Sequence, residues 1–70
     1  MPATISNEEF GRRVGVSHSM ASRMRSGVRL PGVRTMARIS KEFGIPLEEL
    51  VAKHEEGPEA FGAMLRRRVR

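Results

Sequence analysis

The sequence predicts an all-α protein, a compact bundle of four to five short helices. Three observations favour this fold class. No segment keeps the apolar–polar alternation of a strand, and tyrosine and tryptophan are absent. Apolar residues recur instead at spacings of three and four, which places them on one face of a helix. Serines that can begin helices and glycines that can end them separate these segments.

The first predicted helix lies between the N-cap residue Ser6 and Gly15. Glu9, three residues after Ser6, can complete a capping box with it. Phe10 and Val14 are four residues apart and therefore share one face. Gly15 readily adopts the left-handed conformation that ends a helix. This segment has the start signal, the stop signal and the apolar face of a short helix.

A second helix is expected from the N-cap Ser17 to about Ser26. The turn Gly15-Val16-Ser17 joins it to the first helix, and two helices joined by so short a turn form a helix-turn-helix, here from Ser6 to Gly27. Such a motif needs a residue of positive φ in the turn and a small residue where the helices cross. Gly15 meets the first need and Gly11 the second. The residues expected to fill the angle between the helices are Phe10, Val14, Val16, Ala21 and Met24.

Three further helices are expected after the loop 27–32, which is rich in glycine and proline. They cover about 33–43, 46–53 and 59–69, as judged from apolar spacing and from the glycines that follow them. In the first of these helices the residues that recur at helical spacing are Val33, Met36, Ile39, Ser40 and Phe43, and in the second the residues expected to face the core are Leu47, Leu50 and Val51.

The charge pattern points to a polyanionic partner. The net charge is +5, and the stretch from Phe10 to Lys41 carries eight basic residues and no acidic one. A second basic run, residues 66–70, closes the chain. Clustered arginine of this kind is the electrostatic footprint of a nucleic-acid-binding surface. The alternative interpretation is a solvated, arginine-rich surface without a partner.

Seventy residues make one domain, and we assign residues 1–56 to the helix-turn-helix core. Residues 57–70 form a C-terminal helix and basic tail, which either belong to the same domain or dimerise the protein. The absence of cysteine excludes disulfides and thiolate zinc sites. The two histidines, His18 and His54, lie far apart in the sequence, so no metal site and no cofactor are expected.

Four segments of the chain match a known pattern in order and spacing: residues 5–17, 22–27 with Pro31, 36–45 and 47–50. Over this range the sequence resembles the lambda-repressor-like regulators of the Xre/Cro family. The resemblance implies a transcriptional regulator that binds double-stranded DNA, similar to a phage or prophage Cro or repressor protein. Relatives usually carry alanine at the crossing position, where this chain has Gly11.

Relatives also carry a full helix before the motif, whereas only residues 1–4 precede it here. We therefore expect a lambda-repressor-like bundle that lacks the usual first helix. The C-terminal helix is the candidate to close the exposed core, either within its own chain or across a dimer. The residues expected on that face are Phe61, Met64 and Leu65.

In this family the second helix of the motif lies in the major groove. The resemblance thus implies base readout by His18, Ser19, Ser22 and Arg23. Arg23 is the strongest of these candidates, because a guanidinium can donate two hydrogen bonds to guanine O6 and N7. The residues expected to contact DNA phosphates are Ser17, Arg12, Arg25, Arg29, Arg34 and Arg38.

The residues offer no set of nucleophile, base and orienting group, so an enzyme is not expected. The alternative function is a protein-binding regulator of the same fold, of the antitoxin or anti-repressor type, acting through the C-terminal helix. The resemblance also suggests a homodimer, although a monomer closed by its own tail fits equally well. No signal peptide or membrane span is recognisable. We expect the cytoplasm of a prokaryotic cell, and no small-molecule ligand.

Overall fold

Residues 4–69, which the computed structural model describes, form five α-helices and no strand. The helices are α1 (Asn7–Val14), α2 (His18–Ser26), α3 (Val33–Phe43), α4 (Leu47–Glu56) and α5 (Pro58–Arg68). The all-α prediction is confirmed, and so are the positions of all five expected helices. None of the helices within residues 4–69 has both the length and the apolar character needed to cross a membrane.

Serine caps begin the first two helices, as predicted. The Oγ atom of Ser6 accepts a hydrogen bond from the Glu9 amide at 3.0 Å, and Ser17 Oγ accepts one from the Met20 amide at 3.1 Å. The Glu9 carboxylate forms an ion pair with Arg12 instead of accepting a hydrogen bond from the Ser6 amide, which would have completed the capping box. Each cap satisfies an amide that would otherwise lack a partner at the start of a helix.

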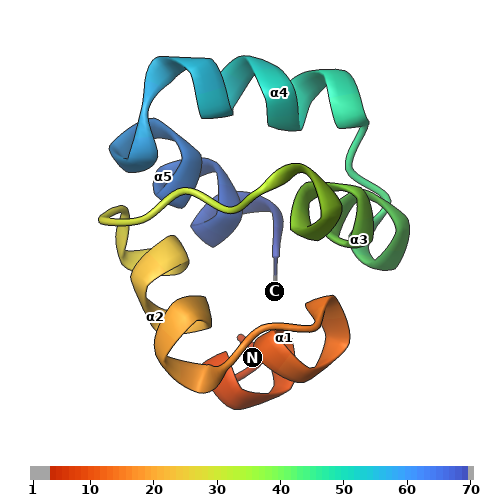
Figure 1. Cartoon of the computed structure of the whole chain (residues 1–70), viewed down its shortest axis with the longest axis vertical. Coiled ribbons are helices and arrows are strands. Elements are labelled where there is room, and N and C mark those ends of the chain that lie inside the picture. Colours follow the sequence, from red (N-terminus) through yellow and green to blue (C-terminus); the bar gives the residue numbers. More distant parts are fainter. Residues whose placement is uncertain (1–3, 70) are drawn as a thin grey trace.

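The five helices close around a single core (Figure 1). The helices α1 and α2 lie at one end of the molecule and α4 crosses the other, with α3 and α5 between them. The packed pairs are α1 with α2 and α3, α4 with α3 and α5, and α5 with α2. Because α5 contacts both α2 and α4, the C-terminal helix bridges the two ends of the bundle.

The core draws on every helix. Its buried apolar residues are Phe10, Val14, Ala21, Met24, Met36, Ile39, Ile45, Leu50, Phe61, Met64, Leu65 and Val69. Burying a side chain such as Phe10 or Phe61 contributes about 1.5–3 kcal/mol to the free energy of unfolding. Since Phe61, Met64 and Leu65 are fully buried, the C-terminal helix closes the core of its own chain.

Three expected core residues lie at the surface instead. Val33 is 77% exposed, Leu47 is 46% exposed and Val51 is 40% exposed. On α4 only Leu50 is buried, because this helix lies across the outside of the bundle and only one narrow side of it meets α3 and α5. The helix also continues to Glu56, three residues past the expected end at Lys53, and stops at Gly57, whose φ is 116°.

Candidate functional site

The two helices of the motif cross at the backbone of Gly11. A Cβ atom built on Gly11 would lie 2.7 Å from the carbonyl oxygen of Val16 and 3.1 Å from that of Ser17. The Gly11 carbonyl in turn accepts hydrogen bonds from the amides of Gly15 and Val16. Glycine is therefore required here by the close approach of the turn, and its cost in helix propensity, about 1 kcal/mol, is offset by that contact.

The rest of the motif is built around this crossing. Gly15 has a φ of 78°, the left-handed conformation in which glycine is favoured, and it reverses the chain within three residues. The other residues expected between the helices are buried or partly buried: Phe10, Val14, Ala21 and Met24 are buried and Val16 is half-buried. Because α1 and α2 share this core, α2 is held at a fixed angle to α1.

One side of α2 is left facing solvent. His18, Ser19 and Arg23 are exposed and Ser22 is half-buried, and their spacing places them on one continuous face of the helix. Ser17, the N-cap, is exposed at the start of the same helix. Among the described residues no ion pair or hydrogen bond engages the side chains of His18, Ser19 or Arg23. All four side chains expected to read bases thus lie on one face, and three of them are exposed.

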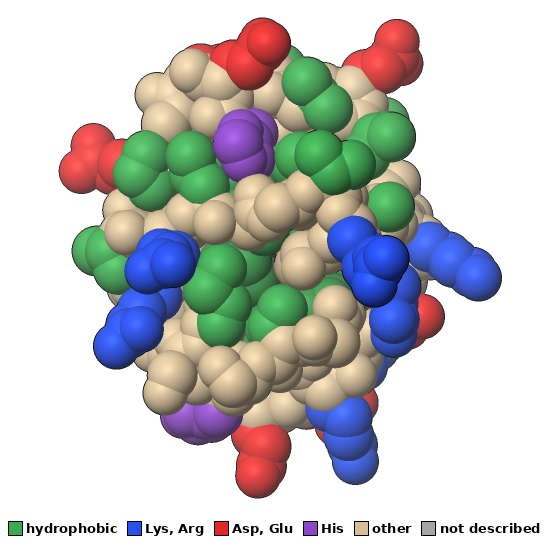
Figure 2. Space-filling model, in the orientation of Figure 1, with side chains coloured by type: hydrophobic (Ala, Val, Ile, Leu, Met, Phe, Trp, Pro, Cys, Tyr) green, Lys and Arg blue, Asp and Glu red, His purple; other side chains and the backbone are tan. Residues whose placement is uncertain are grey.

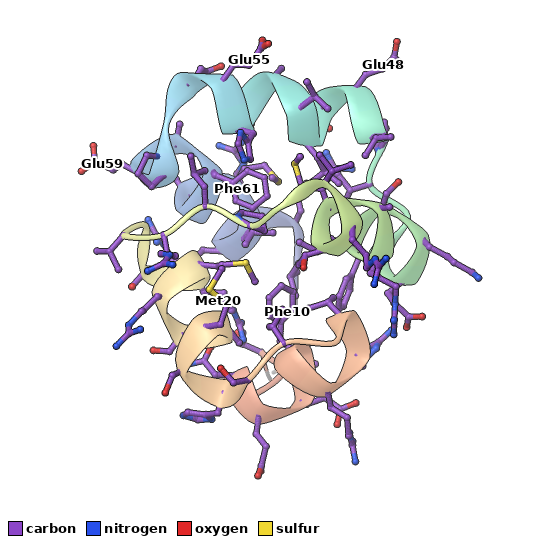
Figure 3. All side chains as sticks on the ribbon, viewed as in Figure 1. Phe10, Met20, Glu48, Glu55, Glu59 and Phe61 are labelled. Atoms are coloured by element: carbon purple, nitrogen blue, oxygen red, sulfur yellow. The ribbon has the colours of Figure 1, made fainter. Side chains whose placement is uncertain are left out.

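Charge is distributed unevenly over the molecule. Figure 2 shows Lys and Arg side chains along both flanks of one face, whereas several acidic side chains lie at the α4 end. Figure 3 shows Glu48 and Glu55 projecting outward from α4, and Glu59 projecting from the start of α5. Glu8 and Glu9 lie in the first turn of α1, so α2 and the loop after it are the more attractive region for an anionic partner.

The expected phosphate-contact residues fall into two groups. Arg29, within the loop after α2, and Arg34, in the first turn of α3, are exposed and make no ion pair with any described residue. Arg12 and Arg38 are also exposed but already have protein partners. Arg12 pairs with Glu9, and Arg38 Nη2 donates to the carbonyl oxygen of Arg13 at 3.1 Å.

Arg25 differs from the expectation, since the structure buries it. Only 9% of this residue is exposed, and Nη1 donates to the Ile5 carbonyl at 2.8 Å and to Asn7 Oδ1 at 3.2 Å. The guanidinium also lies 5.3 Å from the centre of the Phe10 ring. Burial lowers the pKa of Arg25 from its usual value. Arg25 follows Ala21 by four residues, so the periodicity of α2 already placed it on the buried face.

The structure also reveals a contact that the sequence analysis missed. A Cβ atom built on Gly62 of α5 would lie 2.6 Å from both the Cα and the amide nitrogen of Gly27, and 2.9 Å from the Met24 carbonyl. Nearby, Arg66 of α5 donates to the carbonyl oxygen of Arg25. The end of α2 is thus seated backbone-to-backbone on α5. A glycine inside an otherwise apolar helical stretch was the available signal.

Nothing in residues 4–69 suggests a metal centre, because no group of three or more His, Cys, Asp or Glu side chains gathers there. His54 lies partly buried between Pro31 and Phe61. Its Nε2 atom is 2.9 Å from the Pro31 carbonyl, and its ring meets the Phe61 ring edge to face. This histidine holds the loop after α2 against α4 and α5.

Comparison with known proteins identifies a helix-turn-helix family. A family model described as helix-turn-helix matches residues 2–50, which include α1, α2, α3 and the first turn of α4. No curated protein and no solved structure matches the chain. The matched range contains the glycine crossing, the turn and the exposed face of α2, whereas α5 lies outside it.

Proposed function

Because the chain belongs to the helix-turn-helix family of Xre and lambda-repressor-like DNA-binding regulators, we propose that it recognises a specific sequence of double-stranded DNA. The observation that carries this proposal is the exposed face of α2. It presents His18, Ser19 and Arg23 to solvent from a helix that is fixed on α1 and α5. A helix so presented fits the major groove of B-DNA, where base edges can be read.

Each residue of this face has a distinct proposed role. Arg23 donates two hydrogen bonds to a guanine, a contact worth about 1–3 kcal/mol of discrimination. His18 and Ser19 lie in the first turn of α2 and reach neighbouring base edges, together with Ser22. Ser17 caps the helix, whose free amides favour a phosphate oxygen.

The phosphates on either side of the groove are assigned to exposed arginines. Arg29 lies in the loop after α2 and Arg34 in the first turn of α3, and no described residue neutralises them. Arg12 and Arg38 are the second pair, and binding DNA would draw Arg12 away from Glu9. These contacts supply affinity for any sequence, because phosphates carry no base information.

The test compares one residue from each class on a DNA site selected from random duplexes. We expect Arg23→Ala to lower the affinity for the selected site by about tenfold or more, because base readout is removed. Its affinity for a scrambled duplex should change little. Arg29→Ala is expected to lower the affinity for both duplexes by the same factor, because a phosphate contact is lost. Binding is measured by fluorescence anisotropy at constant salt.

Lys53→Ala is the matched control. It removes one positive charge from α4, where Lys53 pairs with Glu56, away from the proposed interface. It should leave both affinities nearly unchanged. Equal losses for Arg23→Ala and Arg29→Ala on both duplexes would refute the division into readout and phosphate contacts.

The burial of the C-terminal apolar residues favours DNA binding over the protein-binding alternative. That alternative needs Phe61, Met64 and Leu65 as an adhesive surface, yet all three are enclosed in the core of this chain. A homodimer on two half-sites about 34 Å apart stays a prediction, which sedimentation equilibrium with and without DNA tests. We further propose a regulatory, non-enzymatic role in a prokaryotic cytoplasm, similar to that of Cro or repressor proteins.

A further inference from the structure

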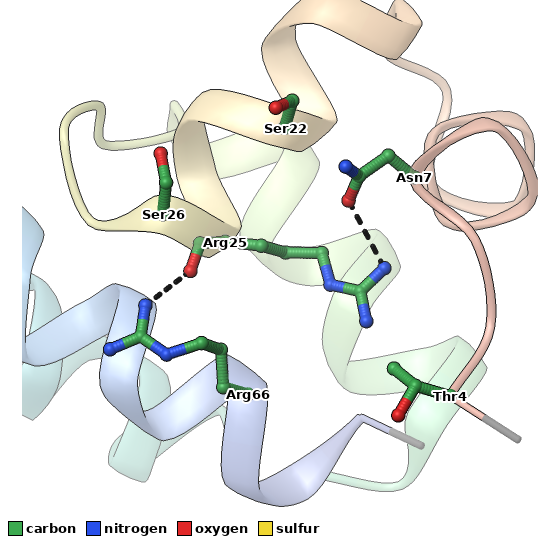
Figure 4. A pocket seen from close by; sticks show the side chains of 6 residues that line it. All are labelled: Thr4, Asn7, Ser22, Arg25, Ser26 and Arg66. Carbon is green, nitrogen blue, oxygen red and sulfur yellow. Dashed lines mark hydrogen bonds between the residues drawn. The ribbon is translucent and has the colours of Figure 1, made fainter.

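A depression opens beside α2, on the side where this helix meets both the start of α1 and the end of α5. Figure 4 shows its lining side chains, which come from three parts of the chain: Thr4, Asn7, Ser22, Arg25, Ser26 and Arg66. Ser22 also borders the exposed face of α2. The depression therefore adjoins the proposed DNA-reading surface and shares Ser22 with it.

The lining is rich in hydrogen-bond donors and carries positive charge. It contains two guanidinium groups, three hydroxyls and one side-chain amide, and none of these six side chains is acidic. Hydroxyl, amide and guanidinium groups can all donate to an oxyanion, and a guanidinium matches the geometry of a phosphate. A cation would find two like charges here.

The two guanidinium groups lack a counterion within residues 4–69. Arg25 donates to the Ile5 carbonyl and the Asn7 amide oxygen, and Arg66 donates to the Arg25 carbonyl, so every acceptor is neutral. Figure 4 shows the Arg66 guanidinium at the backbone carbonyl of Arg25 and the Arg25 guanidinium at the other end of its extended side chain, so the two groups line different ends of the depression. Burying the Arg25 cation without a counterion is unfavourable, and a bound anion would relieve this cost.

Two nitrogen atoms of the Arg25 guanidinium make no hydrogen bond to a described residue. Both of its side-chain hydrogen bonds leave from Nη1, which leaves Nε and Nη2 for another partner. No described side-chain nitrogen or oxygen is fully enclosed without a hydrogen bond, so neither of these two atoms is completely cut off from solvent. The same residue that ties α2 to α1 can thus face an anion.

We propose that this depression binds a phosphate-type oxyanion, held by Arg25 and Arg66 with help from Ser22 and Asn7. The oxyanion has two sources of the same chemistry: a backbone phosphate of DNA that lies along α2, or a free phosphate or phosphorylated small molecule. The existence of the site does not rest on the proposed function; only its first source does.

The site is tested by titrating the full chain with inorganic phosphate at constant ionic strength, followed by ¹H–¹⁵N NMR. We expect saturable shifts of the Arg25 Nε–H and of the Ser22 and Ser26 amides. Arg66→Gln should weaken phosphate binding about tenfold or more, because a charge-assisted hydrogen bond is lost. Ser22→Ala, which changes no charge, should weaken it by a smaller factor.

Lys41→Gln is the matched control, since it removes the same charge from an exposed position of α3 outside the depression. It should leave the phosphate affinity unchanged. Shifts that grow linearly without saturation, or equal effects of Lys41→Gln and Arg66→Gln, would overturn the proposal. Unaltered amide shifts in the core of each variant show that the fold is kept.

A duplex added to the phosphate-loaded protein separates the two sources. If DNA displaces phosphate and Arg66→Gln weakens DNA binding more than Lys41→Gln does, the occupant is a backbone phosphate. If Arg66→Gln abolishes phosphate binding and spares DNA binding, the occupant is a free phosphate compound. A chain that binds phosphate but no duplex would refute the proposed function and uphold the oxyanion site.

Discussion

At the scale of single residues, the position with the least freedom is Gly11. Its Cα faces the carbonyl groups of Val16 and Ser17, and these belong to the rigid turn rather than to flexible side chains. These carbonyls cannot move away without opening the turn, because the Val16 amide donates a hydrogen bond to the Gly11 carbonyl at 2.8 Å. A side chain at this position would act directly on the angle between α1 and α2.

We therefore predict that Gly11→Ala lowers the free energy of unfolding by about 1–3 kcal/mol, despite the better helix propensity of alanine. The measurement is urea unfolding followed by circular dichroism. Gly32→Ala is the control, since a Cβ atom there meets nothing within 4 Å. That control should cost less, because it loses only the N-cap preference of glycine over alanine. A Gly11→Ala variant as stable as the parent would contradict the crossing contact.

Arg25 shows why residue type alone misleads at this scale. In the sequence it is one of a run of arginines, and a run of like charges usually belongs to a solvated face. In the structure its side chain links the end of α2 to the residues at the start of α1, through hydrogen bonds to Ile5 and Asn7. Its position four residues after Ala21 was the stronger signal, because helical periodicity governs burial more directly than charge does.

At the scale of elements, the contact between α2 and α5 decides how the proposed reading helix is held. Gly27 and Gly62 allow the backbones to touch, and Arg66 adds a hydrogen bond to the end of α2. The family match ends at residue 50, so this support comes from a helix outside the matched range. The orientation of α2 thus depends on α1 at its start and on α5 at its end.

The corresponding prediction concerns Gly62→Ala, whose new Cβ atom would lie 2.6 Å from Gly27 backbone atoms. We expect a loss of about 1–3 kcal/mol of stability from overpacking. In a domain of this size each 1 kcal/mol lowers Tm by about 4–8 °C, which thermal unfolding measures. Ala63→Gly, at the exposed neighbouring position, is expected to cost only its helix propensity, about 1 kcal/mol.

DNA binding supplies a second measure of the same substitution. At a temperature where Gly62→Ala is folded, we expect its affinity for the selected duplex to fall, because the end of α2 must move away from α5. Ala63→Gly should bind as the parent does. If Gly62→Ala lost stability but kept full affinity, α5 would support the core without orienting α2.

At the scale of the whole molecule, the separation of charges matters more than the net charge of +5. Acidic side chains gather around α4, and two more lie at the start of α1. The exposed arginines Arg23, Arg29 and Arg34 lie on α2, in the loop after it and at the start of α3, and none of them pairs with a described acid. Such a dipolar arrangement turns one side of the protein toward a polyanion and keeps the other side away from it. Arg13 and Arg68 are not assigned to this surface, because each pairs with a glutamate of another helix, Glu42 and Glu49 respectively.

We predict that log Kd for duplex DNA rises with the logarithm of the salt concentration at a slope of about 4. Each of the four arginines assigned to phosphates, Arg12, Arg29, Arg34 and Arg38, releases about 0.9 counterion. Anisotropy titrations at several NaCl concentrations between about 50 and 200 mM measure this slope. Arg34→Ala should reduce it by about 1, whereas Lys53→Ala should not change it. A slope near zero would show that the arginines do not contact phosphates.

The sequence by itself determined the local features of this protein. The caps at Ser6 and Ser17, the left-handed glycines and the apolar spacing placed five helices within a few residues of their true bounds. It also determined that α2 exposes His18, Ser19 and Arg23, because the other side of that helix carries Ala21 and Met24. These features follow from interactions between residues close in the chain, which a sequence states directly.

Only the tertiary structure decided which faces are covered. It exposed Val33, Leu47 and Val51, buried Arg25 and directed Phe61, Met64 and Leu65 into the core of their own chain. It also brought Gly62 against Gly27 and gathered Arg25 and Arg66 around one depression. A helical pattern tells which residues share a face. Which other element meets that face depends on contacts between distant segments, and no local pattern contains them.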